Sequence, residues 1–209
     1  MISHEHRCIF VHIPRCGGTS IEEVLWPGPR TAADLWMGFV DRYHNRYQTG
    51  GLQHLLARQI EQEVGRDTFS RYFKFAFVRN PFDRAVSQYH LTVRRAELRE
   101  FIGMGPDASF RTYLSLIRRK KHVQWEEQYR FLTDERGNFL VDYVGRFENF
   151  ETDARKVFDR LGIPVGAVPH SRMNRTAHRH YAEYYDAETA AAVRALYARD
   201  LDLFGYSLH

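Results

Sequence analysis

Cysteine, lysine and long apolar runs are all scarce in this sequence of 209 residues. Its two cysteines, Cys8 and Cys16, are too few for a disulfide framework. They flank a predicted strand whose extended length separates them by roughly 20 Å or more, which excludes a bridge between them. No segment approaches the ~18 consecutive apolar residues of a membrane-spanning helix, and the first strand begins too early to leave room for a signal peptide. We therefore expect a soluble cytoplasmic protein in a reducing environment.

Only four of the 30 Lys and Arg residues are lysines, so arginine supplies most of the positive charge. The planar guanidinium group binds phosphate and sulfate through two hydrogen bonds at once. A biased genome composition would give the same ratio, so the arginines alone do not identify a ligand. The formal net charge is only +4 and no nucleic-acid-binding motif is present, so we expect no nucleic-acid partner.

The most informative stretch is CIFVHIPRCGGTSIEEVL, at residues 8–25. Its β-branched and aromatic start predicts a buried strand, and its end predicts a helix. The loop between them contains Arg15, Gly17 and Gly18, and such glycines let backbone N–H groups approach an oxyanion at a helix N-terminus. The loop lacks the GxxxxGK[ST] pattern of nucleotide triphosphatases, so it indicates a phosphate-type ligand without indicating ATP. The alternative is an ordinary strand-to-helix turn.

A second strand-turn-helix unit begins with FKFAFVR, at residues 73–79. Asn80 is a good N-cap and Pro81 a good first helical residue, so a helix should follow the strand directly. Ser87 then lies on the flank of that helix. Because the carboxyl ends of parallel strands share one edge of a sheet, where ligands bind, we expect Arg79 and Ser87 to lie at that edge.

The remaining pattern also alternates between strands and helices, with no internal repeat. It predicts a three-layer α/β domain in which helices flank a central, mostly parallel sheet, and we expect one domain over residues 1–209. The further elements are a helix at 52–64, a mostly helical stretch at 94–128, a strand at 143–147, a helix at 150–161 and a last helix capped by Asp186.

His54 falls inside the predicted helix at 52–64. At about 100° per residue, it would lie roughly 160° from the centre of the apolar stripe. It is therefore not expected in the core, and it either faces solvent or points into a cleft covered by the preceding segment. His12 lies inside the first predicted strand and is interpreted as structural.

Two motifs in the same order resemble those of sulfotransferases. IFVHIPRCGGTSI resembles the 5′-phosphosulfate loop, commonly IPKTGGTS, and FKFAFVRNPFDRAVSQY resembles the 3′-phosphate-binding segment. The tail from VGRFENFETD through NRTAHRHYAEYYD to LDLFGYSL is similar to the carboxyl-terminal half of the carbohydrate-sulfotransferase branch. This resemblance implies a P-loop-like α/β fold, the donor 3′-phosphoadenosine-5′-phosphosulfate (PAPS) and the product 3′,5′-ADP.

The resemblance also implies which residues bind the donor. Arg79 and Ser87 would bind the 3′-phosphate, and Arg146 and the pair Arg175 and Thr176 would add to nucleotide binding. The 5′-phosphosulfate would be held by residues of the first motif, namely Arg15, Gly17, Gly18, Thr19 and Ser20.

The first motif departs from the family pattern at two positions. Arg15 stands where the family usually has lysine, and Cys16 where it usually has threonine. That lysine is thought to stabilise charge on the bridging oxygen as the sulfuryl group leaves. Arginine stays charged and binds two oxygens, but it is bulkier. We expect Arg15 to serve in catalysis as well as in binding, and we assign no chemistry to Cys16.

His54 is the predicted general base, because QHLLARQI resembles the HxxA stretch that carries a proposed catalytic histidine in related enzymes. An acceptor hydroxyl has a high pKa, so in-line displacement at sulfur benefits from such a base. A Mg²⁺-dependent kinase on this scaffold would need a carboxylate at the end of the second strand to hold the metal ion. This strand ends in Arg79 and Asn80 instead, so we expect no metal.

We expect a hydroxyl-bearing acceptor such as a glycan, a glycolipid or a glycosylated small molecule. Residues 26–50 and 95–135 match the family least, and segments 26–50 and 94–128 are predicted to shape the acceptor site. Two alternatives stay open: an inert nucleotide- or glycan-binding protein that kept the fold, and an ATP-dependent small-molecule kinase.

Overall fold

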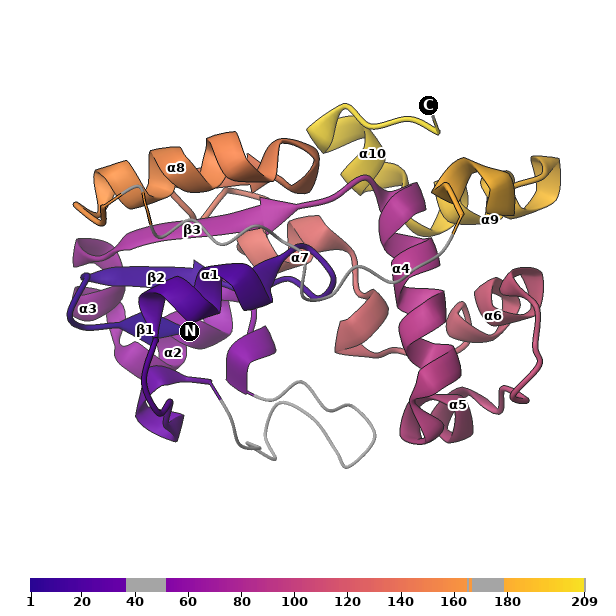
Figure 1. The fold of residues 1–209 in the computed structure, drawn as a ribbon, viewed down its shortest axis with the longest axis horizontal. Helices are drawn as coiled ribbons and strands as arrows, with labels where there is room; N and C mark the ends of the chain where they lie inside the picture. The colour runs from indigo at the N-terminus through magenta and orange to yellow at the C-terminus, as the bar shows by residue number, and fades with distance from the viewer. Residues whose placement is uncertain (37–51, 165, 167–178, 209) are drawn as a thin grey trace.

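A computed structural model describes residues 1–36, 52–164, 166 and 179–208, and its centre is a four-stranded sheet (Figure 1). The strands lie in the order β1-β2-β3-β4, with β1 antiparallel to β2 and the other pairs parallel. The predicted α/β class with a mostly parallel sheet is therefore confirmed. The strands are β1 at Ile2–Ser3, β2 at Cys8–Val11, β3 at Phe73–Val78 and β4 at Tyr143–Arg146.

The helices flank this sheet and also extend beyond it (Figure 1). The α-helices are α1 at Gly18–Leu25, α2 at Ala57–Val64, α3 at Arg66–Arg71, α4 at Pro81–Arg94, α5 at Ala96–Ile102, α6 at Phe110–Ile117, α7 at Gln128–Leu132, α8 at Phe150–Arg160, α9 at Ala187–Leu196 and α10 at Ala198–Phe204. Short 3₁₀ helices are η1 at Ala32–Asp34, η2 at Leu52–His54, η3 at Val123–Trp125, η4 at Phe147–Asn149 and η6 at Tyr181–Tyr184.

The central strand β3 is apolar along nearly its whole length because it is covered on both faces. Phe75, Phe77 and Val78 are almost completely buried, as expected of a parallel strand between helical layers. Helix α8 covers one side through Phe150, whose ring centroid lies 5.0 Å from that of Phe77. Both cysteines are buried and neither forms a disulfide bond, as their predicted separation requires.

A second apolar cluster lies beyond the carboxyl end of β3. It is built around α4, α5, α6 and α9, and includes the buried side chains of Phe82, Val86, Tyr113 and Val193. Figure 1 shows β3 running toward α4, with α5 and α6 beside that helix. The carboxyl edge of the sheet therefore lies between the two clusters, which is where the predicted ligand residues converge. That residues 1–209 form one domain stays a prediction.

One predicted helix boundary is wrong, and one predicted apolar face is divided. The helix expected over 52–64 is interrupted, since η2 ends at His54 and Leu56 has an extended backbone. The Gln59 side chain accepts the Leu56 N–H at 2.8 Å, which caps a new helix start at Ala57. The apolar face predicted to continue from the last helix through Leu201 and Phe204 is also divided, since α9 ends at Leu196 and the φ of −127° at Tyr197 separates it from α10.

The predicted helix caps are confirmed. Asn80 Oδ1 accepts the Phe82 N–H at 3.1 Å, and Pro81 is the first residue of α4. Asp186 likewise accepts the Thr189 N–H at 2.9 Å and starts α9. Among the helices that the structure describes, none combines the length and the apolarity required to cross a membrane.

Candidate active site

Two positions in and after the loop between β2 and α1 accept only glycine. Gly17 has a φ of +85°, and a Cβ there would lie 2.9 Å from Phe150 Cε2. A Cβ on Gly18 would lie 2.1 Å from His12 Nε2. Both glycines are therefore required, the first by its backbone conformation and the second by the imidazole packed against it. The sequence did not predict this contact with His12.

Arg15 lies in this loop and contacts the two predicted ligand-binding residues of the second motif, Arg79 and Ser87. Its Nε donates a hydrogen bond to Ser87 Oγ at 2.9 Å. Its carbonyl oxygen accepts a hydrogen bond from Arg79 Nη1 at 3.1 Å. The structure thus brings together three predicted donor-binding residues from three elements, as expected of the carboxyl edge of a parallel sheet. Thr19 and Ser20 lie in the first turn of α1, which follows this loop directly.

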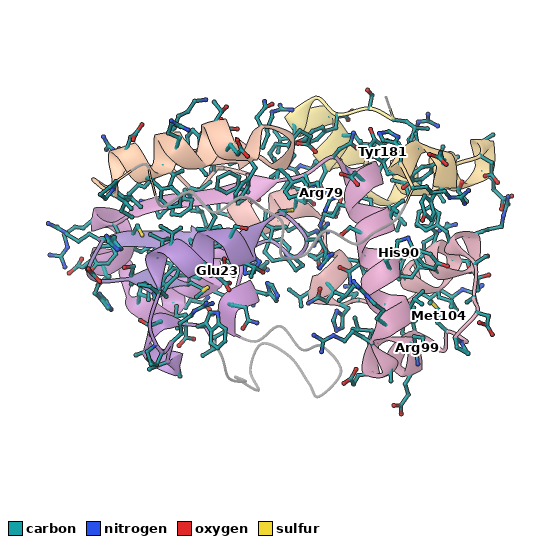
Figure 2. The ribbon with its side chains drawn as sticks, viewed as in Figure 1. Glu23, Arg79, His90, Arg99, Met104 and Tyr181 are labelled. Carbon is teal, nitrogen blue, oxygen red and sulfur yellow. The ribbon has the colours of Figure 1, made fainter. Side chains whose placement is uncertain are left out.

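Arg79 lies between the end of β3 and α4 (Figure 2) and is mostly buried. Its Nε and Nη2 both donate to Asp83 Oδ2 at 2.8 Å, and its guanidinium lies 4.2 Å from the centroid of the Phe147 ring. Asp83 was not among the predicted site residues. Asp83 follows Arg79 by four residues at the start of a predicted helix, and this spacing could have predicted their ion pair.

The site has a surplus of positive charge. Burial, together with the nearby charges of Arg79 and Arg94, lowers the pKa of the Arg15 guanidinium to about 10. A guanidinium whose pKa is lowered by neighbouring positive charges is stabilised when an anion binds beside it. The residues present therefore fit a phosphate- or sulfate-bearing ligand. Within the described residues, no group of three or more His, Cys, Asp or Glu side chains is placed to hold a metal ion.

His54 is partly buried at the same edge of the sheet. Its Nδ1 lies 3.0 Å from the carbonyl oxygen of His12, and the two ring centroids are 4.6 Å apart. A carbonyl oxygen can only accept, so Nδ1 carries the proton and Nε2 keeps its lone pair. Burial and the charge of His12 lower the pKa of His54 to about 3. The imidazole is therefore neutral near pH 7.

His12 in turn contacts a buried carboxylate that the sequence analysis missed. Its Nδ1 lies 2.6 Å from Glu22 Oε1, while Glu22 Oε2 accepts from Arg30 Nη1 at 2.9 Å and from Trp36 Nε1 at 3.1 Å. Burial alone would raise the pKa of Glu22, but these hydrogen bonds and charges lower it to about 2. A glutamate in the predicted helix after the loop was the available signal. The structural role of His12 stays a prediction, which the contact with Glu22 supports.

Arg146, the last residue of β4, contacts the carboxyl-terminal segment of the chain. Its Nη2 donates to the Phe204 carbonyl at 2.6 Å, and its guanidinium lies 4.8 Å from the centroid of the Tyr206 ring. It lines a pocket of about 290 Å³ whose other residues include Asp83, the carboxylate that binds Arg79. Arg175 and Thr176 lie outside the described residues, as does most of segment 26–50.

Comparison with known proteins gives consistent results. Human carbohydrate sulfotransferase 8 is 26% identical over 242 residues, which cover 99% of this chain and 55% of that protein. Its mouse counterpart is 25% identical, with 99% and 56% covered. This chain therefore spans about half the length of these two relatives. An uncharacterized protein of Archaeoglobus fulgidus is 31% identical over 110 residues, covering 52% of this chain and 82% of that protein.

One solved structure, a sulfotransferase from Alicyclobacillus acidocaldarius, is 20% identical, with a TM-score of 0.39 and coverage of 94% of this chain and 97% of that one. The model of the sulfotransferase family matches residues 1–207, which is nearly the whole sequence. On the strength of that match, this chain belongs to the sulfotransferase family.

Proposed function

We propose that this protein transfers the sulfuryl group of PAPS to a hydroxyl group of a carbohydrate-containing acceptor. The observation that carries the proposal is the convergence of Arg15, Arg79 and Ser87, because it supports two adjacent anion sites. PAPS has phosphate groups on both its 5′ and 3′ sides, whereas ATP has none on the 3′ side. The donor supplies an activated sulfuryl group whose leaving group is already a stabilised phosphate anion.

The 5′-phosphosulfate is assigned to the loop and the first turn of α1. Backbone N–H groups at Gly17 and Gly18, with the hydroxyls of Thr19 and Ser20, supply donors at a helix N-terminus. Arg15 adds a full charge, since a pKa of about 10 keeps it protonated at neutral pH. Its role is to neutralise charge on the bridging oxygen as the leaving group departs.

The 3′-phosphate is assigned to Arg79 and Ser87. Asp83 and the Arg15 carbonyl engage three of the five N–H groups of the Arg79 guanidinium, and the others can donate to a phosphate. Arg146, Arg175 and Thr176 are assigned to the rest of the nucleotide.

His54 is assigned as the general base. The His12 carbonyl holds the Nδ1–H tautomer, so Nε2 is available to take the proton of the acceptor hydroxyl. Burial makes the imidazole a weak base in the free protein, and an anion bound in the adjacent cradle would raise its pKa. Positioning and charge neutralisation then supply most of the remaining rate enhancement.

The acceptor class follows from the relatives. Two carbohydrate sulfotransferases match this chain over 99% of its length, which supports a glycan, a glycolipid or a glycosylated small molecule as acceptor. Segments 26–50 and 94–128 are assigned to the acceptor site, and the helices α5 and α6 fall in the second of them.

A calorimetric titration with 3′,5′-ADP and with ATP, each with and without Mg²⁺, tests the donor assignment. We expect 3′,5′-ADP to bind at least about tenfold more tightly than ATP, with no requirement for Mg²⁺. Tighter binding of ATP in the presence of Mg²⁺ would favour the kinase alternative and overturn the proposal.

A further inference from the structure

Gln128 is completely buried at the start of α7, and neither of the two phosphate-binding motifs includes it. Its side-chain amide nevertheless contacts both motifs. Gln128 Oε1 accepts the Arg79 N–H at 2.8 Å, and Nε2 donates to the Arg79 carbonyl at 2.8 Å. The same Oε1 accepts a hydrogen bond from Cys16 Sγ at 3.3 Å. Burial raises the pKa of the Cys16 thiol to about 12, so the thiol keeps the proton that it donates.

The two hydrogen bonds from the Gln128 amide take the place of a neighbouring strand at Arg79. The pairing of β3 with β4 ends at Val78, which is opposite Arg146. Arg79 lies one residue beyond this pairing, and its buried backbone N–H and C=O still need hydrogen-bond partners. The amide of Gln128 offers the same donor and acceptor as a peptide group. It therefore fixes the backbone on both sides of Arg79, and with it the direction in which the Arg79 side chain leaves the strand.

Gln128 is itself held from the opposite side. Its backbone N–H donates to Asp200 at 2.7 Å, and the Tyr129 N–H donates to the same carboxylate at 2.8 Å. The buried side chain of Arg84 also binds the preceding segment, through the Glu126 carbonyl at 2.9 Å, and the Pro14 carbonyl at 3.0 Å. The segment that contains Gln128 is therefore anchored to α4, to α10 and to the loop that carries Arg15.

We propose that Gln128 is a positioning residue that sets the separation between the two phosphate sites. It fixes Arg79 directly, and through Cys16 it restrains the loop that carries Arg15. The inference rests on the proposed function, since it assumes a ligand that occupies both sites. A ligand with two phosphates gains affinity only when both sites are held at its own spacing, whereas a ligand with one phosphate does not depend on that spacing.

The test compares 3′,5′-ADP with 5′-AMP and 3′-AMP in calorimetric titrations of the wild type and of Gln128→Met, which keeps an unbranched side chain of similar size. We expect the wild type to prefer 3′,5′-ADP over either monophosphate by about 100-fold or more. In Gln128→Met this preference should fall at least about tenfold, while the affinity for each monophosphate changes by less than about threefold. An unchanged preference, or an equal loss for all three ligands, would overturn the inference.

Two further variants separate positioning from a general loss of stability. Leu132→Ala removes a fully buried side chain from the same helix without touching the amide, so it should lower the melting temperature and leave the preference unchanged. An equal fall of the preference in Leu132→Ala would overturn the inference. Cys16→Ala removes the thiol, and with it the hydrogen bond to Gln128 and the longer contact to the Pro14 carbonyl at 3.7 Å. A fall of about threefold in the preference is expected, and no change there would contradict the link to the loop. If the wild type itself showed no preference, the proposed donor would fail before any variant is compared.

Discussion

Arg15 Nε donates a hydrogen bond to Ser87 Oγ across 2.9 Å, which joins the loop after β2 to helix α4. The two residues come from separate motifs, one assigned to the 5′ side of the donor and the other to its 3′ side. Their contact means that the two proposed anion sites would be adjacent. Under the proposed function, a ligand with phosphates on both its 5′ and 3′ sides would contact both residues.

Removing the Ser87 hydroxyl should weaken donor binding. In Ser87→Ala we expect the affinity for 3′,5′-ADP to fall by roughly tenfold, because a hydrogen bond to a charged group contributes about 1.5–3 kcal/mol. Isothermal titration calorimetry measures the change. Ser70→Ala, at an exposed position on α3, is the control and should bind as the wild type does. An unchanged affinity in Ser87→Ala would remove this residue from the site.

Replacing Arg15 with the lysine that is usual in the family should preserve turnover. Arg15→Lys keeps the charge, and we expect turnover within about tenfold of the wild type. Arg15→Ala removes the charge and should lower turnover by at least about 10²-fold. Initial rates at saturating donor compare the two. Equal rates in Arg15→Ala and the wild type would show that this position binds the donor without taking part in the reaction.

His54→Ala should lose turnover by at least about 10²-fold while the affinity for 3′,5′-ADP stays within a few-fold. The pH dependence gives a second test. Because the pKa of His54 in the free protein is about 3, kcat/KM for the donor, which reports the free protein, should not fall as the pH is lowered from 7 to about 5. A decline centred near the ordinary pKa of histidine, about 6.5, would contradict the buried neutral imidazole.

Glu22 should stabilise the fold in a pH-dependent way. Its pKa is lowered to about 2 in the folded state, so its contribution is complete above the ordinary value of 4.5 and is lost as the pH falls toward 2. We expect Glu22→Gln to lower the free energy of unfolding by up to about 3 kcal/mol at pH 7, with a smaller deficit at pH 3. Chemical denaturation at several pH values measures this, with Glu23→Gln as the control on the same helix. A deficit that stays constant with pH would contradict the assignment.

The sheet and the meeting of the two motifs could be predicted because they depend on local patterns. The apolar run of β3, the cap at Asn80 and the rule that parallel strands end at one edge were sufficient. The break after His54 could not be predicted, because Leu52 and Leu55 keep their burial in a 3₁₀ turn and the new helix start depends on the Gln59 side chain.

The supporting contacts of the site were also beyond prediction from the sequence. Two examples are the imidazole of His12, which packs against Gly18, and the side-chain amide of Gln128, which binds the backbone of Arg79. In each pair, the two residues become neighbours only when the chain folds. No period or motif specifies such a pair. Arg175 and Thr176 stay predictions, since they lie outside the described residues.

The most direct test of the account is transfer of labelled sulfate from PAPS to a panel of glycans, glycolipids and glycosylated small molecules. We predict labelled product with at least one hydroxyl acceptor in the wild type, and a loss of at least about 10²-fold in His54→Ala. If the wild type binds 3′,5′-ADP but transfers no label to any acceptor, the chain is a binding protein on this fold, and the proposed activity is contradicted.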